Sequence, residues 1–288
     1  MSQRLFVDGA SGTVGMALQP HLERLVDEGL IELIAIPDAM RKEEHYRREA
    51  MKQADLVVLC LPDELAGEAV SMLEACNPGA RILDASAAHR VHDGWVYGLP
   101  ELVSAHAIAH ARRVANPGCF ATACILGGAP LANAFSGLTQ MVFNGLTGYS
   151  AGGRKAHANS TPRLVQFGRV HRHLVEIERF TRLRPVLTTT VGPWYQGMMV
   201  QTYIPQTEEE VLLAFQEAYQ GNPMVEVVRS SEVEGRVNPQ ACNGTNEVLI
   251  CVAGQPYGGT SVAVVLDNLG KGSAGAAAAN LRLMLTGQ

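Results

Sequence analysis

Short apolar runs separated by charged, helix-like stretches fill the first hundred residues. The runs over 4–8, 31–36, 55–61 and 81–84 have the length and the branched side chains of buried strands. The run over 55–61 is apolar throughout, as in a parallel strand that is buried on both faces. Strands that alternate with helices predict an α/β fold with a Rossmann-like, doubly wound parallel sheet.

Beyond residue 138 the pattern changes, because strand now follows strand. Strands are predicted over 139–147, 185–191, 198–204, 225–229, 246–252 and 260–266, with one helix over 208–219. This order predicts a second α+β domain built on a largely antiparallel sheet. An Ala-rich helix over 268–285 follows, and its small side chains indicate close packing.

Composition narrows the class of protein. The chain has 288 residues, of which 47% are hydrophobic, and a net charge of −5. This length suits two domains or one large α/β domain, and the charge argues against a general surface for nucleic acid. No apolar run is long enough to span a membrane, and the N-terminus lacks a signal-peptide pattern. Six scattered cysteines without a C-x-x-C pair predict a reduced, cytoplasmic protein with no metal site.

A glycine-rich turn follows the first predicted strand directly. It has the pattern G-x-x-G-x-x-G over residues 9–15, and a helical pattern begins near its end. Glycines let backbone N–H groups approach a pyrophosphate at a helix N-terminus, although a turn without a ligand is the alternative. We predict a dinucleotide site with Gly9, Ser11, Gly12, Thr13, Val14 and Gly15.

The residues after the second predicted strand report on the ribose of a dinucleotide. Asp38 could bind a 2′-hydroxyl, whereas Arg41 and Lys42 could pair with a 2′-phosphate. The alternative is a solvated start of the charged helix predicted over 41–52. Because two cations, Arg41 and Lys42, stand against the single acid Asp38, we predict NADP(H) as the cofactor in preference to NAD(H).

The fourth predicted strand ends at Asp84, where a ligand of a parallel sheet is expected to lie. Ser86 and Arg90 follow it and are candidates for the cofactor or a substrate anion. The alternative, equally compatible with these residues, is an Asx- or Ser-type turn that binds no ligand.

The candidate nucleophile is Cys119. It follows the tight turn Asn116-Pro-Gly and begins a run typical of a buried helix. Free N–H groups and the positive end of the helix dipole favour a thiolate at such a position. A buried structural thiol is the alternative.

Two later stretches carry further candidate side chains. The Gly-rich loop after the strand at 139–147 offers Ser150, Arg154 and Lys155 to an anionic substrate, unless it is a plain surface loop. His171, His173 and Glu176 follow in a stretch with helical character. His173 and Glu176 would share a helical face, so one of the histidines is the expected acid/base partner of the cysteine.

Three stretches together resemble the N-acetyl-γ-glutamyl-phosphate reductase family, in its shorter second type. They are Asn116-Pro-Gly-Cys119, His171-Arg-His173-x-x-Glu176-Ile and Asp267-Asn-Leu-Gly-Lys-Gly-x-x-Gly275. The resemblance covers essentially the whole chain. Family members have Pro one residue before the Glu, where this chain has Val175, and the substitution removes no functional group.

The resemblance implies an NADPH-dependent enzyme of arginine biosynthesis that acts on an acyl phosphate through a cysteine thioester. It implies Cys119 as nucleophile, a protonated histidine, His173 by preference, as proton donor, and Asn116 or backbone N–H groups as oxyanion ligands. It also implies that the last helix packs on the cofactor domain, with Asn268 near the cofactor. The expected domains are then 1–118 plus 268–288, which binds NADP, and 119–267, which carries catalysis and forms a homodimer or homotetramer.

Two other functions remain open at this point. An aspartate-semialdehyde dehydrogenase, or another acyl-phosphate reductase of the same fold, would share most of these residues. A non-catalytic NADP-binding sensor would not need Cys119 at a helix start beside a histidine pair.

Overall fold

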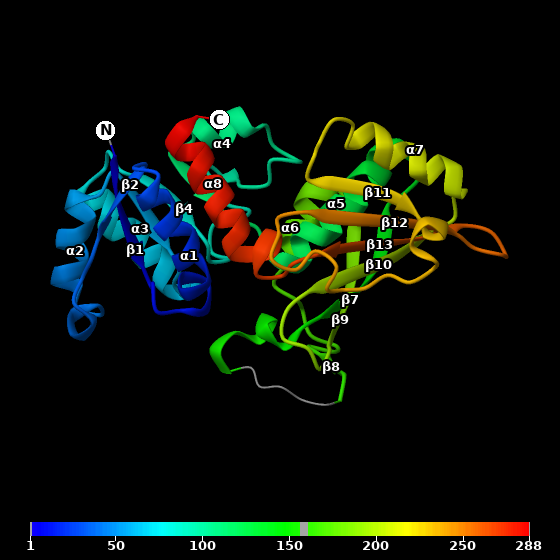
Figure 1. The fold of residues 1–288 in the computed structure, drawn as a ribbon, viewed down its shortest axis with the longest axis horizontal. Helices are drawn as coiled ribbons and strands as arrows, with labels where there is room; N and C mark the ends of the chain where they lie inside the picture. Colours follow the sequence, from blue (N-terminus) through cyan, green and yellow to red (C-terminus); the bar gives the residue numbers. More distant parts are fainter. Residues whose placement is uncertain (1, 156–160, 288) are drawn as a thin grey trace. The chain divides into compact units, whose positions relative to one another are not determined.

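The computed structural model describes residues 2–155 and 161–287, with the side chains of 154 and 155 left out. The chain divides into two compact units, each drawn in Figure 1. Unit 1 comprises Met1–Pro117 and Ser273–Gln288, and unit 2 comprises Gly118–Gly272.

Unit 1 holds a parallel sheet in the order β2-β1-β3-β4-β6-β5. Neighbouring strands pair in parallel throughout this sheet, as the alternation of strands and helices predicts. The strands are β1 (Gln3–Asp8), β2 (Ile31–Ile34), β3 (Leu56–Leu59), β4 (Arg81–Asp84), β5 (Val96–Tyr97) and β6 (Arg113–Ala115).

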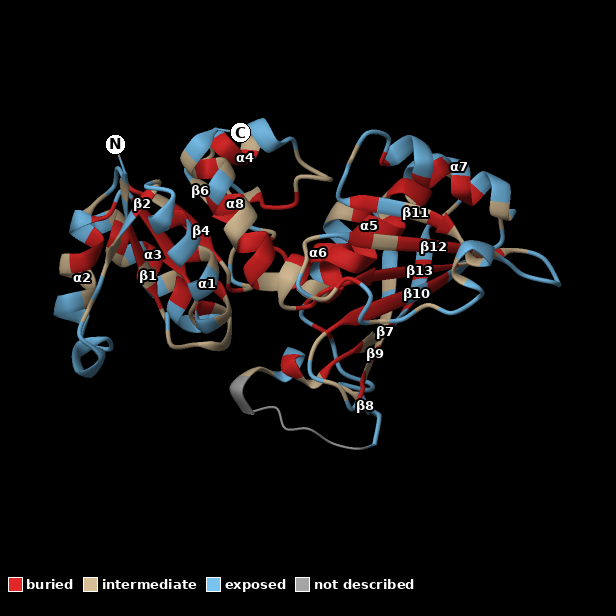
Figure 2. Ribbon diagram, viewed as in Figure 1, coloured by how far each residue is buried: buried red, intermediate tan, exposed pale blue. Residues whose placement is uncertain are grey.

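Helices cover both faces of this sheet, because successive strand residues point to opposite sides. Leu56 and Val58 of β3 pack with apolar residues of α1, α4 and α8, whereas Val57 and Leu59 pack with those of α2 and α3. Figure 2 shows the buried sheet between the half-exposed helices. The helices are α1 (Thr13–Asp27), α2 (Glu44–Gln53), α3 (Asp63–Cys76), α4 (Ala105–His110) and α8 (Gly275–Thr286). The doubly wound Rossmann-like prediction is therefore confirmed.

Unit 2 holds a mixed sheet in the order β11-β12-β13-β10-β7-β9-β8 within the described residues. β11 with β12 and β7 with β9 pair in parallel, and the other neighbours pair antiparallel, so the sheet is largely antiparallel as predicted. The strands are β7 (Gln140–Thr147), β8 (Arg163–Val165), β9 (Arg184–Val191), β10 (Met198–Ile204), β11 (Val225–Arg229), β12 (Val248–Gly254) and β13 (Thr260–Leu266).

Three helices pack together on one face of the second sheet, namely α5 (Cys119–Ala134), α6 (Leu174–Thr181) and α7 (Glu208–Ala218). The opposite face carries Val142, Val186 and Tyr203, which are 48%, 40% and 56% exposed. Strand register places them together, because Val142 pairs with Val186 and Gln201 pairs with Asn144. Part of this sheet therefore presents apolar side chains to solvent.

Three predicted helix boundaries are wrong, and each has a local reason. The charged helix α2 begins at Glu44 instead of Arg41, because Asp38–Met40 forms a short 3₁₀ turn first. α6 begins at Leu174, so both histidines precede it. The last helix begins at Gly275, because Gly270–Ala274 forms a π-helical turn.

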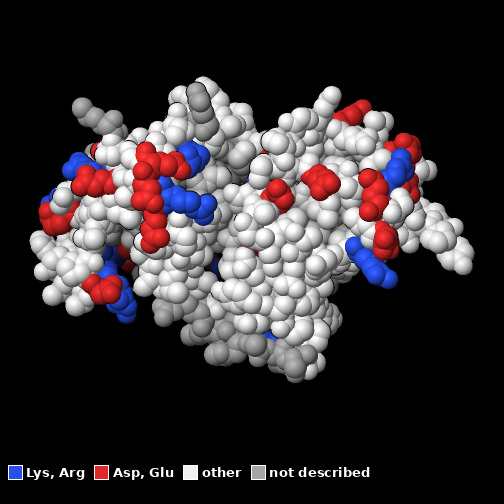
Figure 3. Space-filling model, in the orientation of Figure 1, with Lys and Arg blue, Asp and Glu red and all other residues white. Residues whose placement is uncertain are grey.

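Acidic and basic side chains lie interspersed on the face of the molecule in Figure 3. Ion pairs such as Arg48–Glu44 and Lys52–Glu49 on α2 lie at this surface. Among the described residues, no helix combines the length and apolarity that crossing a bilayer requires.

Candidate active site and cofactor cavity

Cys119 is the first residue of α5, as the sequence predicts, with Gly118 as N-cap. The hydroxyl of Thr122 donates to the carbonyl oxygen of Gly118 at 3.0 Å and fixes the turn. The first N–H groups of a helix have no intrahelical acceptor, so they offer donors and a positive dipole end beside the thiol. This placement favours a thiolate.

Four of the other five thiols have a different setting. Burial raises the pKa of Cys60 to about 12, and burial raises the pKa of Cys124 well above its ordinary value. Burial likewise raises the pKa of Cys242 and of Cys251. These four groups are therefore thiols at neutral pH, whereas a nucleophile must be a thiolate.

Glu176 supports the nucleophile's turn. Its side chain is 1% exposed, and Oε2 accepts a hydrogen bond from the backbone N–H of Gly118 at 3.1 Å. The sequence interpretation placed His173 and Glu176 on one helical face, but His173 is the N-cap residue of α6 and precedes its first turn. Glu176 thus ties α6 to the start of α5.

His171 and His173 form a buried pair with ring centroids 4.7 Å apart. The backbone N–H of His173 donates to Nδ1 of His171 at 3.2 Å, which places the proton of a neutral His171 on Nε2. Burial and the neighbouring Arg172 lower the pKa of His171. His171 is therefore neutral at pH 7.

Phe120 connects this pair to the nucleophile. Its ring lies 5.8 Å from that of His171 and 6.4 Å from that of His173, measured between centroids. Because Phe120 directly follows Cys119, the contact brings both imidazoles to the start of α5. The sequence analysis did not single out Phe120.

Gly272 closes the other side of the nucleophile. A Cβ atom added to Gly272 would lie 2.6 Å from Cβ and 3.1 Å from Cα of Cys119. Its backbone N–H donates to the carbonyl oxygen of Asp267 at 2.8 Å. Hydrogen in place of a side chain is what lets the π-helical turn approach Cys119.

Asn268 and Ser150 are linked to each other inside unit 2. Nδ2 of Asn268 donates to Oγ of Ser150 at 2.9 Å, and its Oδ1 accepts from the N–H of Gly197 at 2.7 Å. This arrangement holds the loop after β7 against the end of β13. The predicted substrate ligands Arg154 and Lys155 have side chains outside the described residues.

A cavity of about 760 Å³ lies in unit 1 beyond the carboxyl ends of β1, β2 and β3. Gly9, Ser11 and Gly12 line it, and Thr13 and Val14 open α1 next to it. A Cβ on Gly9 would lie 2.4 Å from the carbonyl oxygen of Cys60, and φ at Gly9 is +88°. The loop therefore needs glycine, and its backbone faces a space that suits a dinucleotide.

Gly15 has a supporting place in the same loop. A Cβ there would lie 2.5 Å from the carbonyl oxygen of Ala10, so its lack of a side chain lets α1 start close to the turn. In dinucleotide-binding folds, the third glycine of the loop likewise allows the helix to pack closely.

Asp38, Arg41 and Lys42 also line the cavity. Nη1 of Arg41 lies 3.7 Å from Oδ1 of Asp38, and the Asp38 side chain is 97% exposed. The 3₁₀ turn over Asp38–Met40 separates Asp38 from the start of α2 at Glu44.

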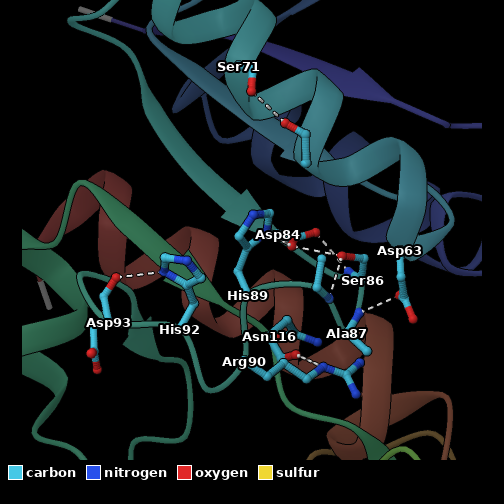
Figure 4. A network of polar contacts seen from close by, with 12 residues as sticks. Asp63, Ser71, Asp84, Ser86, Ala87, His89, Arg90, His92, Asp93 and Asn116 are labelled. Atoms are coloured by element: carbon cyan, nitrogen blue, oxygen red, sulfur yellow. Dashed lines mark hydrogen bonds and ion pairs between the residues drawn. The ribbon is translucent and has the colours of Figure 1, made fainter.

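Ser86 and Asp84 form the Asx-type turn that the sequence left as an alternative (Figure 4). Asp84 accepts from Ser86 N–H and Oγ at 2.8 Å each and from Nδ1 of His89 at 2.6 Å. The His89 ring stacks on Trp95 at 4.2 Å. The turn fixes Arg90, whose Nε donates to the carbonyl oxygen of Asn116 at 2.9 Å.

The side chain of Asn116 is engaged inside unit 1. Its Nδ2 donates to the carbonyl oxygen of Ser273 at 3.0 Å, and its Oδ1 accepts from Asn280 at 3.1 Å. Asn280 also donates to the carbonyl oxygen of Gly98 at 2.9 Å. These bonds anchor the strand end that leads to the cysteine turn.

Two family models match the chain. The semialdehyde dehydrogenase NAD binding domain matches residues 6–111, and the semialdehyde dehydrogenase dimerisation domain matches residues 119–268. An N-acetyl-gamma-glutamyl-phosphate reductase from Burkholderia ambifaria is 39% identical, over 98% of this chain and 96% of the relative. One from Brucella ovis is 36% identical over 99% of each chain.

The chain belongs to the N-acetyl-γ-glutamyl-phosphate reductase family.

Solved structures of more distant proteins have the same fold. Aspartate semialdehyde dehydrogenase II from Vibrio cholerae aligns with a TM-score of 0.75 at 15% identity, over 99% of this chain and 98% of that one. The enzyme from Candida albicans, solved with NADP, aligns with a TM-score of 0.70 at 12% identity, over 99% and 100%. At these identities the likeness shows the fold that this reductase family shares with them.

Proposed function

We propose that the chain reduces N-acetyl-L-glutamyl 5-phosphate to N-acetyl-L-glutamate 5-semialdehyde with NADPH and releases phosphate, as a step of arginine biosynthesis. Family membership supports this substrate. The observation that carries the chemistry is Cys119 at the N-terminus of α5, with the His171–His173 pair joined to it through Phe120.

The Cys119 thiolate attacks the acyl carbon of the substrate. The C–O bond to phosphate breaks, phosphate leaves, and a thioester with Sγ forms. Backbone N–H groups at the start of α5 are the proposed oxyanion donors, because the Asn116 amide already donates to Ser273. Glu176 keeps this turn in place through Gly118.

NADPH, when bound, would supply the hydride that reduces the thioester carbon to the oxidation state of an aldehyde. As the C–S bond breaks, Sγ recovers its electron pair and the aldehyde leaves. The net reaction consumes one proton, which a protonated imidazole donates to the phosphate oxygen that leaves. We assign this task to His173, because burial and Arg172 keep His171 neutral.

Substrate anions need cations and hydrogen-bond donors. We propose that Arg90, Ser150, Arg154 and Lys155 bind the phosphate and the carboxylate of the substrate. Arg90 is 8% exposed and held against Asn116, and Ser150 is 5% exposed and held by Asn268. Asn268 is then a positioning residue for the loop that carries Ser150.

The cofactor site is proposed in unit 1, where the glycine loop and the cavity fit a dinucleotide. Ser86 follows the end of β4, at the same sheet edge, and is a further proposed cofactor ligand. Arg41 and Lys42 are assigned to the 2′-phosphate. Replacing both by Ala should weaken NADPH binding by at least ~10-fold and hardly change NADH binding, since charge-assisted hydrogen bonds are lost.

Dissociation constants for NADPH and NADH, measured by fluorescence on the Arg41→Ala/Lys42→Ala protein, check the assignment. An equal loss for both cofactors would assign these cations to the surface instead of the 2′-phosphate. Arg48→Ala, which removes a surface ion pair on α2, is the matched control and should leave both constants unchanged.

The activity is tested in the reverse direction. Phosphate-dependent reduction of NADP⁺ is measured with N-acetyl-glutamate semialdehyde and, in parallel, with aspartate semialdehyde. We expect turnover with the first aldehyde that Cys119→Ala abolishes. A higher kcat/KM with aspartate semialdehyde would make the chain an aspartate-semialdehyde dehydrogenase, and cofactor binding without turnover of either would indicate a sensor.

We further propose a homodimer, with a homotetramer as the larger alternative, that acts in the cytoplasm. The apolar sheet face with Val142, Val186 and Tyr203 supports a second copy of the chain as its occupant. The match of residues 119–268 to a dimerisation domain supports a self-association role for the same part of the chain. Six free thiols support a reducing compartment.

A further inference from the structure

Asp8 is a buried acid in the wall of the proposed cofactor cavity. It ends β1, directly precedes Gly9 of the glycine loop and lines the cavity. Its side chain is only 4% exposed. A carboxylate in such a place would repel the phosphates of a dinucleotide, and a buried charge needs a partner.

Arg47 on α2 supplies that partner. Its Nη2 lies 2.7 Å from Oδ2 of Asp8, and its Nε lies 3.2 Å and 3.1 Å from the two carboxylate oxygens. The Arg47 side chain is 15% exposed and lines the same cavity. Two donor nitrogens directed at one carboxylate form the geometry that guanidinium groups favour.

The orientation distinguishes Arg47 from the two other cations of the cavity. Arg41 and Lys42 follow the end of β2, where a ribose is expected, and Arg41 is about half exposed. Arg47 instead turns its Nε and Nη2 toward Asp8. Its charge is therefore matched to the protein's own acid rather than offered to a 2′-phosphate.

We infer that the Asp8–Arg47 ion pair is a positioning and charge-neutralising pair for the dinucleotide, with Arg47 cancelling the repulsion that Asp8 would exert on the pyrophosphate. The inference rests on the proposed cofactor site. Because NADPH and NADH share the pyrophosphate, Arg47 acts on both alike, whereas Arg41 and Lys42 act on NADPH alone.

The experiment compares four proteins without turnover: the unchanged chain, Arg47→Gln, Asp8→Asn and the double variant. Dissociation constants for NADPH and NADH are measured by nicotinamide fluorescence and by calorimetry at pH 8. Arg47→Gln should weaken both cofactors by a similar factor of about ten or more, the size expected for one uncompensated charge near a phosphate. The double variant should return to within about threefold of the unchanged chain, because it has no charge left to repel.

Arg48→Gln is the matched control. It removes the neighbouring arginine of α2, which pairs with Glu44 at the surface, and changes the net charge equally. Both dissociation constants should stay within about twofold, since surface pairs contribute little.

Several outcomes would overturn the inference. The first is an Arg47→Gln protein that binds both cofactors as tightly as the unchanged chain, and the second is one that loses affinity for NADPH alone. The third is a double variant that binds the cofactors no more tightly than Arg47→Gln does. If Arg47→Gln fails to fold, Asp8→Asn decides, because it keeps Arg47 and should bind both cofactors at least as tightly as the unchanged chain. An unchanged chain that binds neither cofactor would refute the cofactor site itself, which the other outcomes leave standing.

Discussion

Replacing Gly272 by alanine tests the contact that shapes the nucleophile's surroundings. The new Cβ would lie 2.6 Å from Cβ of Cys119, well inside van der Waals contact, and 3.2 Å from the carbonyl oxygen of Asp267. The neighbours on both sides are main chain or Cβ atoms, which cannot rotate away. The start of α5 or the turn that carries Gly272 must therefore move.

The size of the effect follows from this overlap. Overpacking of one methyl group destabilises a protein by about 1–3 kcal/mol. Relieving the overlap needs a displacement on the order of 1 Å, and a shift of that size at a reacting group lowers turnover by ~10²-fold. We therefore expect a large loss of kcat with a moderate loss of stability.

The assay is phosphate-dependent reduction of NADP⁺, together with the rate at which iodoacetamide alkylates Cys119 and the thermal unfolding midpoint. The matched control is Gly67→Ala on α3, where an added Cβ meets no atom within 4 Å. This control should keep full activity and gain stability, because alanine favours helix more than glycine does. A Gly272→Ala protein with unchanged turnover and unchanged alkylation would refute the reasoning.

Three further predictions concern the same site. Cys119→Ala should abolish turnover but keep NADPH affinity. In the unchanged chain, iodoacetamide should alkylate Cys119 faster than the other five thiols at pH 7.5, since buried thiols such as Cys60, with a pKa of about 12, stay protonated. Equal alkylation rates in mass spectrometry would contradict an activated thiol. His173→Asn should lower kcat by ~10²–10⁴ and His171→Asn by less, and the reverse order in steady-state kinetics would exchange their roles. Folding lowers the pKa of His171 below its ordinary value of about 6.5, so the unfolded chain binds a proton at His171 more readily than the folded chain does. The free energy of unfolding should therefore fall as the pH drops through about 6.5. His171→Asn should reduce this loss, measured by urea unfolding at pH 7.5 and pH 5.

Local patterns predict much of this fold. The continuous apolar run of β3 and the runs of β10 and β13 become strands, because their burial follows from side-chain chemistry alone. The Asn-Pro-Gly turn places Cys119 at a helix start because proline fixes φ in the turn and glycine, without a side chain, fits the N-cap position. Such features depend on a few neighbouring residues.

Contacts between distant residues could not be predicted in this way. Arg47 and Asp8 meet only because α2 packs beside β1, and Gly272 meets Cys119 only through the packing of unit 2. The two-residue strand β5 has no periodicity to detect, and it forms by pairing with β6. The start of α6 was misplaced because His173 has no strong preference for a helix interior over its end.

The last helix has a consequence for how the chain matures on the ribosome. Ala277, Leu281 and Met284 of α8 belong to the same apolar cluster as Leu18 and Leu22 of α1. Translation delivers α1 before unit 2 and α8 after it, so these α8 partners of α1 emerge only once unit 2 has been made. Unit 2 is continuous in sequence and can complete its packing while unit 1 still exposes this apolar surface to chaperones.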